Sequence, residues 1–272
     1  MTSPWTTGQM AIGRDRFFYS GLLGNSGKPR CLGGITIYVA PEGGFDIGFG
    51  KSGPFENRQI AALRPYETHR LVSPCGRILN LGFEPESLSD RAQASLIARA
   101  NDPEQGADLA RRIRAAEPHL AASVGAEGFT DRAFDQLFLG DALTPRRMDA
   151  RIAAVMRTIC AEIEDNALSA DDLAAQAGLS TSRFLHLFKE NTGIAFRSLR
   201  MWKRARRFLD HANGSDSLTE VALELGYPDS SHFSHSIRRT YGLKPRSIRN
   251  GSRNLKVFAG AGYTLGPDRV MP

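Results

Sequence analysis

The chain has 272 residues, with 35 Lys and Arg against 29 Asp and Glu and a formal net charge of +6. This length is sufficient for two compact domains. Residues 166–250 carry most of the excess charge, 13 Lys and Arg against 8 Asp and Glu, which gives +5. A basic segment joined to a nearly neutral one is typical of a polyanion-binding domain with a partner domain. Net charge alone leaves open that the excess of Arg only aids solubility.

The cysteines argue against a disulfide framework and against a structural zinc site. Cys31, Cys75 and Cys160 are odd in number and far apart, with no C-x-x-C pair, which favours a reducing compartment. The N-terminus lacks the basic and apolar regions of a signal peptide, and no apolar run reaches the roughly 20 residues that span a bilayer. We therefore expect a cytoplasmic protein without a membrane contact, a metal or a cofactor.

Residues 16–83 contain short apolar runs separated by turns that are rich in glycine and proline. Short strands at regular spacing with turn signals between them predict a small sandwich or barrel. The expected strands are 16–23, 34–40, 45–49, 58–63 and 77–83.

From residue 86 the apolar pattern becomes helical. Ser87-Leu-Ser-Asp90 and Asp102-Pro-Glu-Gln105 resemble helix starts, and Thr144-Pro-Arg-Arg opens a further helix. The apolar side chains of that last helix share one face, which forms either a core or a contact with a second subunit. They are Met148, Ile152, Val155, Met156 and Ile159.

The most informative feature of the chain is an internal repeat near its C-terminus. The motif Phe184-Leu-His186-Leu-Phe188-Lys189 returns 49 residues later as Phe233-Ser-His235-Ser-Ile237-Arg238. Upstream, Leu-Ala-x-x-x-Gly178 returns at an offset of 48 as Val-Ala-x-x-x-Gly226. Each copy predicts a helix, a glycine turn and a second helix. Two such units in one basic segment indicate a sequence-specific DNA-binding protein.

In each copy the second helix has an apolar side and a polar outer side. The first copy buries Phe184, Leu187 and Phe188, and the second buries Phe233 and Ile237. The outer side is the one that faces base edges when such a helix lies in a major groove. The residues predicted to read bases are Ser182, Leu185, His186, Ser231, His232 and His235. A metal site on the histidine pair is the alternative, and it lacks a nearby Cys or carboxylate to complete it.

Between the copies, residues 196–211 predict an Arg-rich helix that holds the two recognition helices at a fixed separation. Trp202 and Phe208 are expected to pack this helix into both copies. If both helices enter one face of the duplex, their half-sites lie about 10 bp apart. The Arg run either contacts phosphates or is a solvated face. The residues predicted to contact phosphates are Ser180, Lys189, Arg197, Arg200, Lys203, Arg204, Arg238 and Arg246.

These motifs resemble the AraC/XylS family of bacterial transcription regulators, over about 85 of the 272 residues. The matching positions are Leu173-Ala174, Gly178, Ser180, Phe184, His186, Phe188-Lys189, Gly193, Arg204, Phe208-Leu209, Val221-Ala222, Gly226-Tyr227, Ser231, Phe233-Ser234, Gly242 and Pro245. The chain departs from the family pattern at His235, where Arg is usual, at Ile237, where Phe is usual, and near Ile248, where an aromatic is usual. Histidine donates to guanine or phosphate without the two-pronged geometry of Arg, so the base preference stays open.

The resemblance implies an α+β protein of two domains. Residues 1–85 would form a cupin-like effector barrel and 86–163 a helical connector or dimerisation region. Residues 164–250 would form an all-α DNA-binding domain with helix-turn-helix motifs at 172–193 and 219–242, and 251–272 a tail. An effector in the barrel would contact Tyr19, Tyr38, Phe45 and Phe49, although each can equally belong to a plain core. Because His69 is the only histidine before His119, a metal-dependent enzymatic barrel is disfavoured.

The leading hypothesis is a ligand-responsive transcription regulator, an activator rather than an enzyme. It would bind promoter double-stranded DNA as a homodimer and act on RNA polymerase. One alternative is a DNA-binding regulator without an effector, controlled by its abundance or by a protein partner. Another is an enzyme with an appended DNA-binding domain, as in repair proteins of this family that carry a reactive cysteine. Neither Cys31 nor Cys75 has a sequence context that would activate a thiolate.

Overall fold

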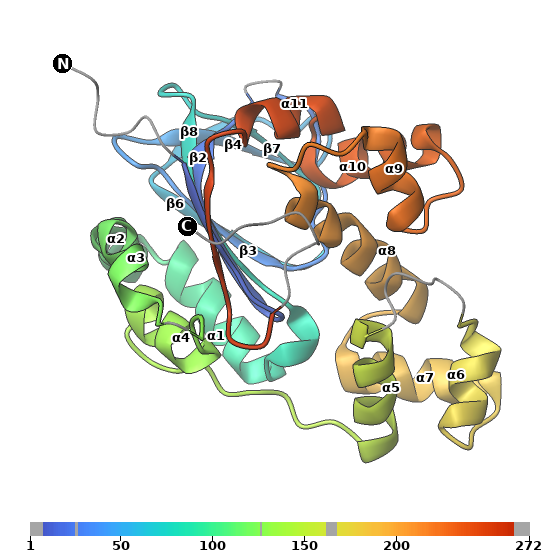
Figure 1. Cartoon of the computed structure of the whole chain (residues 1–272). Helices are drawn as coiled ribbons and strands as arrows, with labels where there is room; N and C mark the ends of the chain where they lie inside the picture. The colour runs from blue at the N-terminus through green and yellow to red at the C-terminus, as the bar shows by residue number, and fades with distance from the viewer. Residues whose placement is uncertain (1–7, 25–26, 126, 162–167, 264–272) are drawn as a thin grey trace.

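The computed structural model of the chain describes residues 8–24, 27–125, 127–161 and 168–263 (Figure 1). The predicted boundary at residues 163–164 and the end of the predicted tail, 264–272, lie outside them. Within the described residues, the strands form a six-stranded sheet, β6-β3-β8-β2-β1-β9, and a three-stranded sheet, β5-β4-β7. Their bounds are β1 (Gln9–Ile12), β2 (Arg16–Leu22), β3 (Ile35–Val39), β4 (Phe45–Phe49), β5 (Phe55–Arg58), β6 (Ile60–Leu63), β7 (His69–Val72), β8 (Arg77–Phe83) and β9 (Lys256–Ala259).

The two sheets form an open sandwich, one of the two predicted forms, and not a closed barrel. No named strand of one sheet pairs with a named strand of the other, so β6 and β9 remain edges of the larger sheet within the described residues. Closure would need a continuous stagger of hydrogen-bonded strands around the sheet. The predicted strands at 16–23, 34–40, 45–49, 58–63 and 77–83 are confirmed as β2, β3, β4, β6 and β8, with shifted ends in β2, β3 and β6. The strands β1, β5, β7 and β9 were not predicted.

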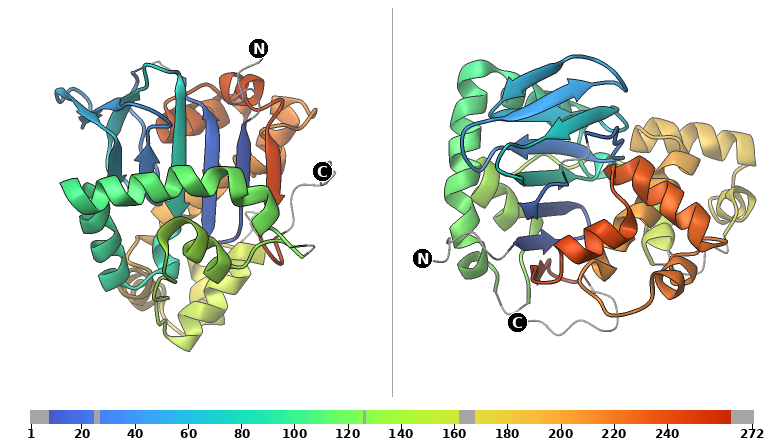
Figure 2. Two further views of the ribbon diagram at one scale, coloured as in Figure 1. Left: turned by 90° about the vertical axis from the view of Figure 1, so that its left-hand side faces the viewer. Right: turned by 90° about the horizontal axis from the view of Figure 1, so that it is seen from above.

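One face of the larger sheet is covered by helices. Phe18 and Leu81 lie opposite each other in the β2–β8 register and point to this face, and the ring of Phe138 stacks on Phe18 at 4.5 Å. Figures 1 and 2 show the covering helices in green. They are α1 (Asp90–Asn101), α2 (Pro103–Ala116), α3 (Leu120–Ser123) and α4 (Asp131–Leu139), with the 3-10 turns η1 (Pro85–Ser87) and η2 (Glu117–His119). The predicted start at Asp102 is confirmed, and α1 begins within the other predicted motif, where Ser89 and not Ser87 is the cap. Strands β1–β8 with these helices are called the N-terminal domain.

The second face of the larger sheet is shared by two partners. Toward one end it packs on the smaller sheet, where Tyr38, Phe45 and Leu71 are fully enclosed. Elsewhere Met10 and Phe17 pack against Trp202 of the C-terminal helices. The C-terminal helices therefore rest directly on the sheet.

The C-terminal helices form two heads joined by a long helix (Figure 1). The first head consists of α6 (Ala170–Gln176) and α7 (Thr181–Thr192), and the second of α9 (Leu218–Glu224) and α10 (Ser230–Tyr241). Between them run α8 (Phe196–Arg207) and the 3-10 turn η3 (Phe208–His211), and α11 (Pro245–Gly251) follows the second head. Phe184 and Phe188 fill the first head, and Phe233 meets Phe208 edge-on at 5.2 Å in the second.

Helix α5 (Ala150–Ala161) belongs to the first head by packing. Ile152, Val155 and Ile159 are buried in the same cluster as Phe184 and Phe188, which supports the core interpretation of this apolar face. The helix begins at Ala150, later than the Thr144-Pro sequence predicts, because residues 145–149 form the link from the N-terminal domain.

The segment after the second head returns to the N-terminal domain. Strand β9 pairs in parallel with β1, with Gln9 opposite Lys256 and Ile12 opposite Ala259. A strand of four residues has too short a pattern to be recognised from sequence, and its pairing spans most of the chain. The second head is thus connected to the sheet both through α8 and through β9.

Candidate nucleic-acid interface

Both recognition helices, α7 and α10, are delimited by local sequence signals. The Ser180 hydroxyl accepts from the Arg183 amide at the start of α7, and the Asp229 carboxylate accepts from the Ser231 amide at 2.8 Å at the start of α10. Both helices end at a glycine with positive φ, Gly193 at 77° and Gly242 at 69°. Such angles are costly for residues with a Cβ, so the glycines fix both helix ends.

The helices before the recognition helices carry matching capping boxes. Ser169 and Asp172 exchange side-chain to backbone bonds at the start of α6, and Ser217 and Glu220 do so at the start of α9. Each box satisfies two amide donors of the first helical turn. Both heads are therefore helix-turn-helix units whose construction follows from the repeat.

All six residues predicted to read bases are exposed. The outer face of α7 carries Ser182, His186 and Leu185, whose side chain is an apolar group 39% exposed. Ser231, His232 and His235 lie on the outer face of α10. The ring of His232 is held at the helix start, with Nδ1 2.8 Å from an Asp229 oxygen. Each recognition helix thus carries three of the six predicted residues on one exposed face. Their contact with bases stays a prediction.

Five of the eight predicted phosphate-binding residues are exposed, namely Ser180, Lys189, Arg197, Arg238 and Arg246. Arg200 and Arg204 are half-buried and also support α8. Arg200 Nη1 donates to the Leu168 carbonyl at 2.6 Å, and the Arg204 guanidinium lies over the Tyr227 ring, 5.2 Å from its centroid.

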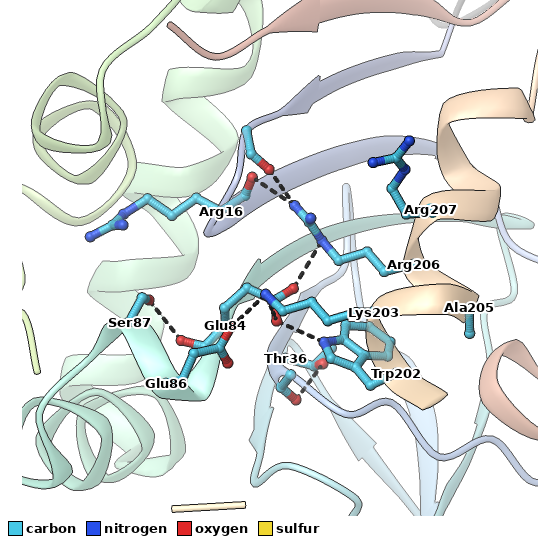
Figure 3. Close-up of polar contacts among 12 residues, drawn as sticks. Arg16, Thr36, Glu84, Glu86, Ser87, Trp202, Lys203, Ala205, Arg206 and Arg207 are labelled. Carbon is cyan, nitrogen blue, oxygen red and sulfur yellow. Dashed lines mark hydrogen bonds and ion pairs between the residues drawn. The ribbon is translucent and has the colours of Figure 1, made fainter. Parts of the chain in front are cut away.

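The prediction that Lys203 contacts phosphate is corrected, because its side chain is buried against carboxylates of the N-terminal domain. Lys203 is 4% exposed, and its Nζ forms ion pairs with Glu84 at 2.9 Å and Glu86 at 2.5 Å (Figure 3). Desolvation by burial opposes the charge of Lys203, yet the two carboxylates outweigh it and raise its pKa. The ammonium is therefore committed to the domain interface and cannot contact phosphate in this arrangement.

Two further residues of α8 complete this buried cluster on Glu84. Trp202 Nε1 donates to Glu84 Oε2 at 2.9 Å, and Arg206 Nε lies 3.0 Å from Glu84 Oε1 (Figure 3). Arg206 also donates to the Gly13 carbonyl at 2.5 Å. We name Glu84, Glu86, Trp202, Lys203 and Arg206 the interdomain charge cluster.

The expected position of Trp202 between the two heads was wrong, because its indole packs on the N-terminal domain. A Cβ at Gly33 would come within 2.4 Å of the Trp202 side chain. Phe208, by contrast, packs in the second head as predicted, although in that head alone. The sequence offers one signal for this domain contact, the carboxylates Glu84 and Glu86 directly after the apolar strand β8. Carboxylates that become buried there need charged or hydrogen-bonding partners.

A groove of about 540 Å³ runs between α8 and α10. Its basic lining includes Arg197, Arg204 and Arg239, with His232 and His235, while Cys31 and Tyr66 of the N-terminal domain also contribute. None of its described lining residues carries a carboxylate. A groove of this charge suits a phosphodiester backbone.

A separate, mostly apolar cavity of about 340 Å³ lies between the N-terminal domain and the second head. Of the predicted effector residues, Tyr19 and Tyr38 line it. Phe45 does not, since it fills the core between the sheets, and Phe49 is 37% exposed outside it. Burial raises the pKa of Tyr19 to about 12, so this phenol is neutral at physiological pH.

The cationic group in this cavity is Arg30, which is 4% exposed. Among the described residues, its Nε and Nη2 have no hydrogen-bond partner. A buried guanidinium with unused donors is costly unless an acceptor is supplied. The lining from the second head and its flanks includes Leu209, Tyr241, Leu243 and Leu255.

Other kinds of site find little support in the part of the chain that the structure describes. No group of three or more His, Cys, Asp or Glu is arranged to hold a metal ion there. Burial raises the pKa of the Cys160 thiol, which is the opposite of what a nucleophile requires. None of the described helices combines the length and the apolar character needed to cross a bilayer.

The comparison with protein families matches the two heads. Residues 173–251 fit the family described as a helix-turn-helix domain. The HTH-type transcriptional activator RhaS of Escherichia fergusonii is 34% identical over 110 residues, covering 38% of this chain and 38% of that protein. The bifunctional transcriptional activator/DNA repair enzyme Ada of Escherichia coli is 31% identical over 104 residues, covering 38% of this chain and 29% of that protein. The matched regions thus span well under half of either relative.

Over nearly the whole chain, the fold is similar to that of apo ToxT from Vibrio cholerae. The TM-score is 0.54 at 11% sequence identity, over 88% of this chain and 98% of that one. At this identity the likeness concerns the fold alone. It confirms the predicted class, a β-rich N-terminal domain followed by a helical helix-turn-helix domain.

Proposed function

Because its C-terminal domain belongs to the AraC/XylS family of helix-turn-helix domains, we propose that this chain is a transcription regulator that activates its promoters. The observation that carries the proposal is the pair of capped recognition helices with exposed polar outer faces, joined by α8. A rigid linker sets a fixed separation, which selects two half-sites about 10 bp apart on one face of the duplex.

In this proposal the two sets of contacts have different tasks. Ser182, Leu185 and His186 read one half-site, and Ser231, His232 and His235 read the other. The exposed basic residues on and beside the recognition helices bind phosphates, which sets affinity and salt dependence without base information. Leu185 offers an apolar contact that suits a thymine methyl.

We also propose that a small-molecule effector controls DNA binding from the interdomain cavity. The cavity is lined by both domains, so a bound molecule would contact the second head directly. Apolar walls with Arg30 as the buried cation suit a small apolar anion. This shifts the expected site from the centre of the N-terminal domain, at Phe45, to its contact with the second head.

An effector-independent regulator, controlled by its abundance or by a protein partner, is the second candidate. The interdomain charge cluster favours it, because buried ion pairs hold α8 against the N-terminal domain without any ligand. A homodimer on promoter DNA and a contact with RNA polymerase remain part of the proposal in either case.

Selection of bound sequences from random duplex DNA tests the function, with purified protein in the presence and absence of a cell metabolite extract. Two half-sites about 10 bp apart are the expected result. Enrichment only with extract would support effector control, and equal enrichment would favour the second candidate. Absence of any motif under both conditions would refute sequence-specific binding.

A thermal-shift screen of small carboxylic acids then tests the cavity, with Arg30→Met as the matched variant. A ligand that stabilises the wild-type chain and not the variant would place its carboxylate on Arg30. Equal stabilisation of both proteins would exclude Arg30 as its partner.

A further inference from the structure

The N-terminal domain contacts the second recognition helix beside its exposed face. A groove of about 480 Å³ lies there, on the C-terminal half of α10. Lys28 and Pro29, which precede β3, line it together with Arg238, Arg239 and Lys244 from the second head, and His235 completes the basic lining. Both domains therefore contribute positive charge to one groove.

No carboxylate stands among the residues described as lining this groove. Four lysine and arginine side chains gather across the domain contact, and such a group attracts a polyanion with a strength that falls as ionic strength rises. His235, a predicted base-reading residue, also lines the groove. A DNA duplex bound by α10 would therefore be the nearest polyanion.

The segment that carries Lys28 is held firmly against the second head. The Cys31 amide donates to the Thr240 carbonyl at 3.0 Å, across the domain boundary. Gly24 lies so close to Leu243 that a Cβ there would come within 2.4 Å of the leucine side chain.

The same segment is also anchored to the N-terminal domain. Arg30 and His69 exchange backbone hydrogen bonds, at 2.9 and 3.1 Å. The segment is bonded to the second head at Cys31 and to the rest of the N-terminal domain at Arg30. Lys28 therefore keeps its place beside α10 in the folded chain.

We propose that Lys28 contacts a DNA phosphate, so that the N-terminal domain forms part of the DNA interface beside the second head. This inference rests on the proposed function, since it requires α10 to lie in a major groove. Lys28 extends the basic surface formed by Arg238 and Lys244 along the backbone that flanks the second half-site. It carries no base information, and its contribution is the same on any sequence.

The extra contact gives the N-terminal domain a direct effect on affinity. Any movement of the domain against the second head displaces Lys28 from the backbone. DNA binding by the second head would therefore depend on the domain contact, whereas α7 of the first head is not among the residues that line this groove.

The test is a salt titration of the full chain on its selected DNA and on random duplex, comparing wild type with Lys28→Ala. Loss of one phosphate contact lowers the slope of log K against log salt by about 0.9. Affinity should fall by the same factor on both DNAs, and Lys28→Arg should restore it. Lys51→Ala is the matched control, because Lys51 is an exposed lysine of the same domain in the turn after β4 and does not line this groove.

An unchanged slope for Lys28→Ala, with normal binding by the wild type, would overturn this inference and leave the proposed function intact. Tighter binding by Lys28→Ala would also overturn it, since it would mean that the segment obstructs DNA. If the wild type selected no DNA sequence, the proposed function itself would fail. Equal thermal midpoints of the variants exclude a folding defect as the cause of weaker binding.

Discussion

The two heads have nearly the same local construction and different surroundings. Each has a capping box, a glycine turn, a capped recognition helix and an αL glycine at its end. The first head packs on α5 through Ile152 and Val155, and its helix α7 contacts the 3-10 turn η1 of the N-terminal domain. The second head contacts the N-terminal domain through the Cys31–Thr240 bond and the interdomain cavity, and β9 returns from it to the larger sheet. Repetition of sequence therefore produces two heads of one construction, while tertiary contacts give them different neighbours, and the second head lines the interdomain cavity.

The largest expected effect comes from removing the centre of the interdomain charge cluster. Glu84→Ala leaves Lys203 and Arg206 buried without their main carboxylate, which should lower the free energy of unfolding by about 3–5 kcal/mol. Denaturant titration measures the loss. Glu56→Ala is the control, because Glu56 pairs with Arg58 at the surface and should cost less than about 1 kcal/mol. Similar losses for the two variants would mean that the cluster does not hold α8 on the sheet.

We expect stability to depend on pH through His69, which is bonded through its backbone to the segment that contacts the second head. Burial is the main cause that lowers its pKa from about 6.5 to about 4. The unfolded chain therefore binds a proton that the folded chain rejects between these values, so stability falls as pH drops from 6.5 toward 4. The loss amounts to about 3 kcal/mol.

Denaturation at several pH values checks the His69 prediction, with His69→Gln as the variant. The variant should flatten the pH dependence between pH 6.5 and 4. An unaltered pH profile would show that other groups govern acid stability.

A smaller effect distinguishes the two heads on DNA. His186→Ala and His235→Ala should each cost about 1–3 kcal/mol at the selected site. Each variant should relax the preference at one position, and the two positions should lie in different half-sites. Selection from random DNA repeated with each variant provides the measurement. Loss of preference in the same half-site would contradict the assignment of one head to each.

The smallest effect concerns the stability of each head by itself. Ser169→Ala and Ser217→Ala remove equivalent caps, each worth about 1 kcal/mol. Because the second head is also bound to the sheet, its amides should exchange mainly through larger openings, whereas α6 should become locally less protected. Hydrogen exchange measured on both variants tests this difference. Equal local loss in α6 and α9 would show that contact with the N-terminal domain does not protect the second head.

Sequence by itself determined the features that depend on near neighbours. The capping residues Ser169, Ser180 and Ser217, the glycine turns and the apolar sides of α7 and α10 are local signals, and the repeat made them visible twice. The exposed outer faces follow from the same helical periodicity. The five strands β2, β3, β4, β6 and β8 are predictable for the same reason, since apolar runs between turns are also local.

Tertiary structure alone decided which charges stay exposed on the heads and which hold the domains together. Lys203 and Arg204 are adjacent in one Arg-rich helix, yet the first is buried on Glu84 and the second lies over Tyr227. Nothing in the helix sequence separates them, because the partner carboxylates lie more than 100 residues earlier. The pairing of β9 with β1, the position of Arg30 in the cavity and the approach of Lys28 to α10 depend on the same long-range packing. Such contacts form only when the sheet and the second head meet, so no local pattern carries them.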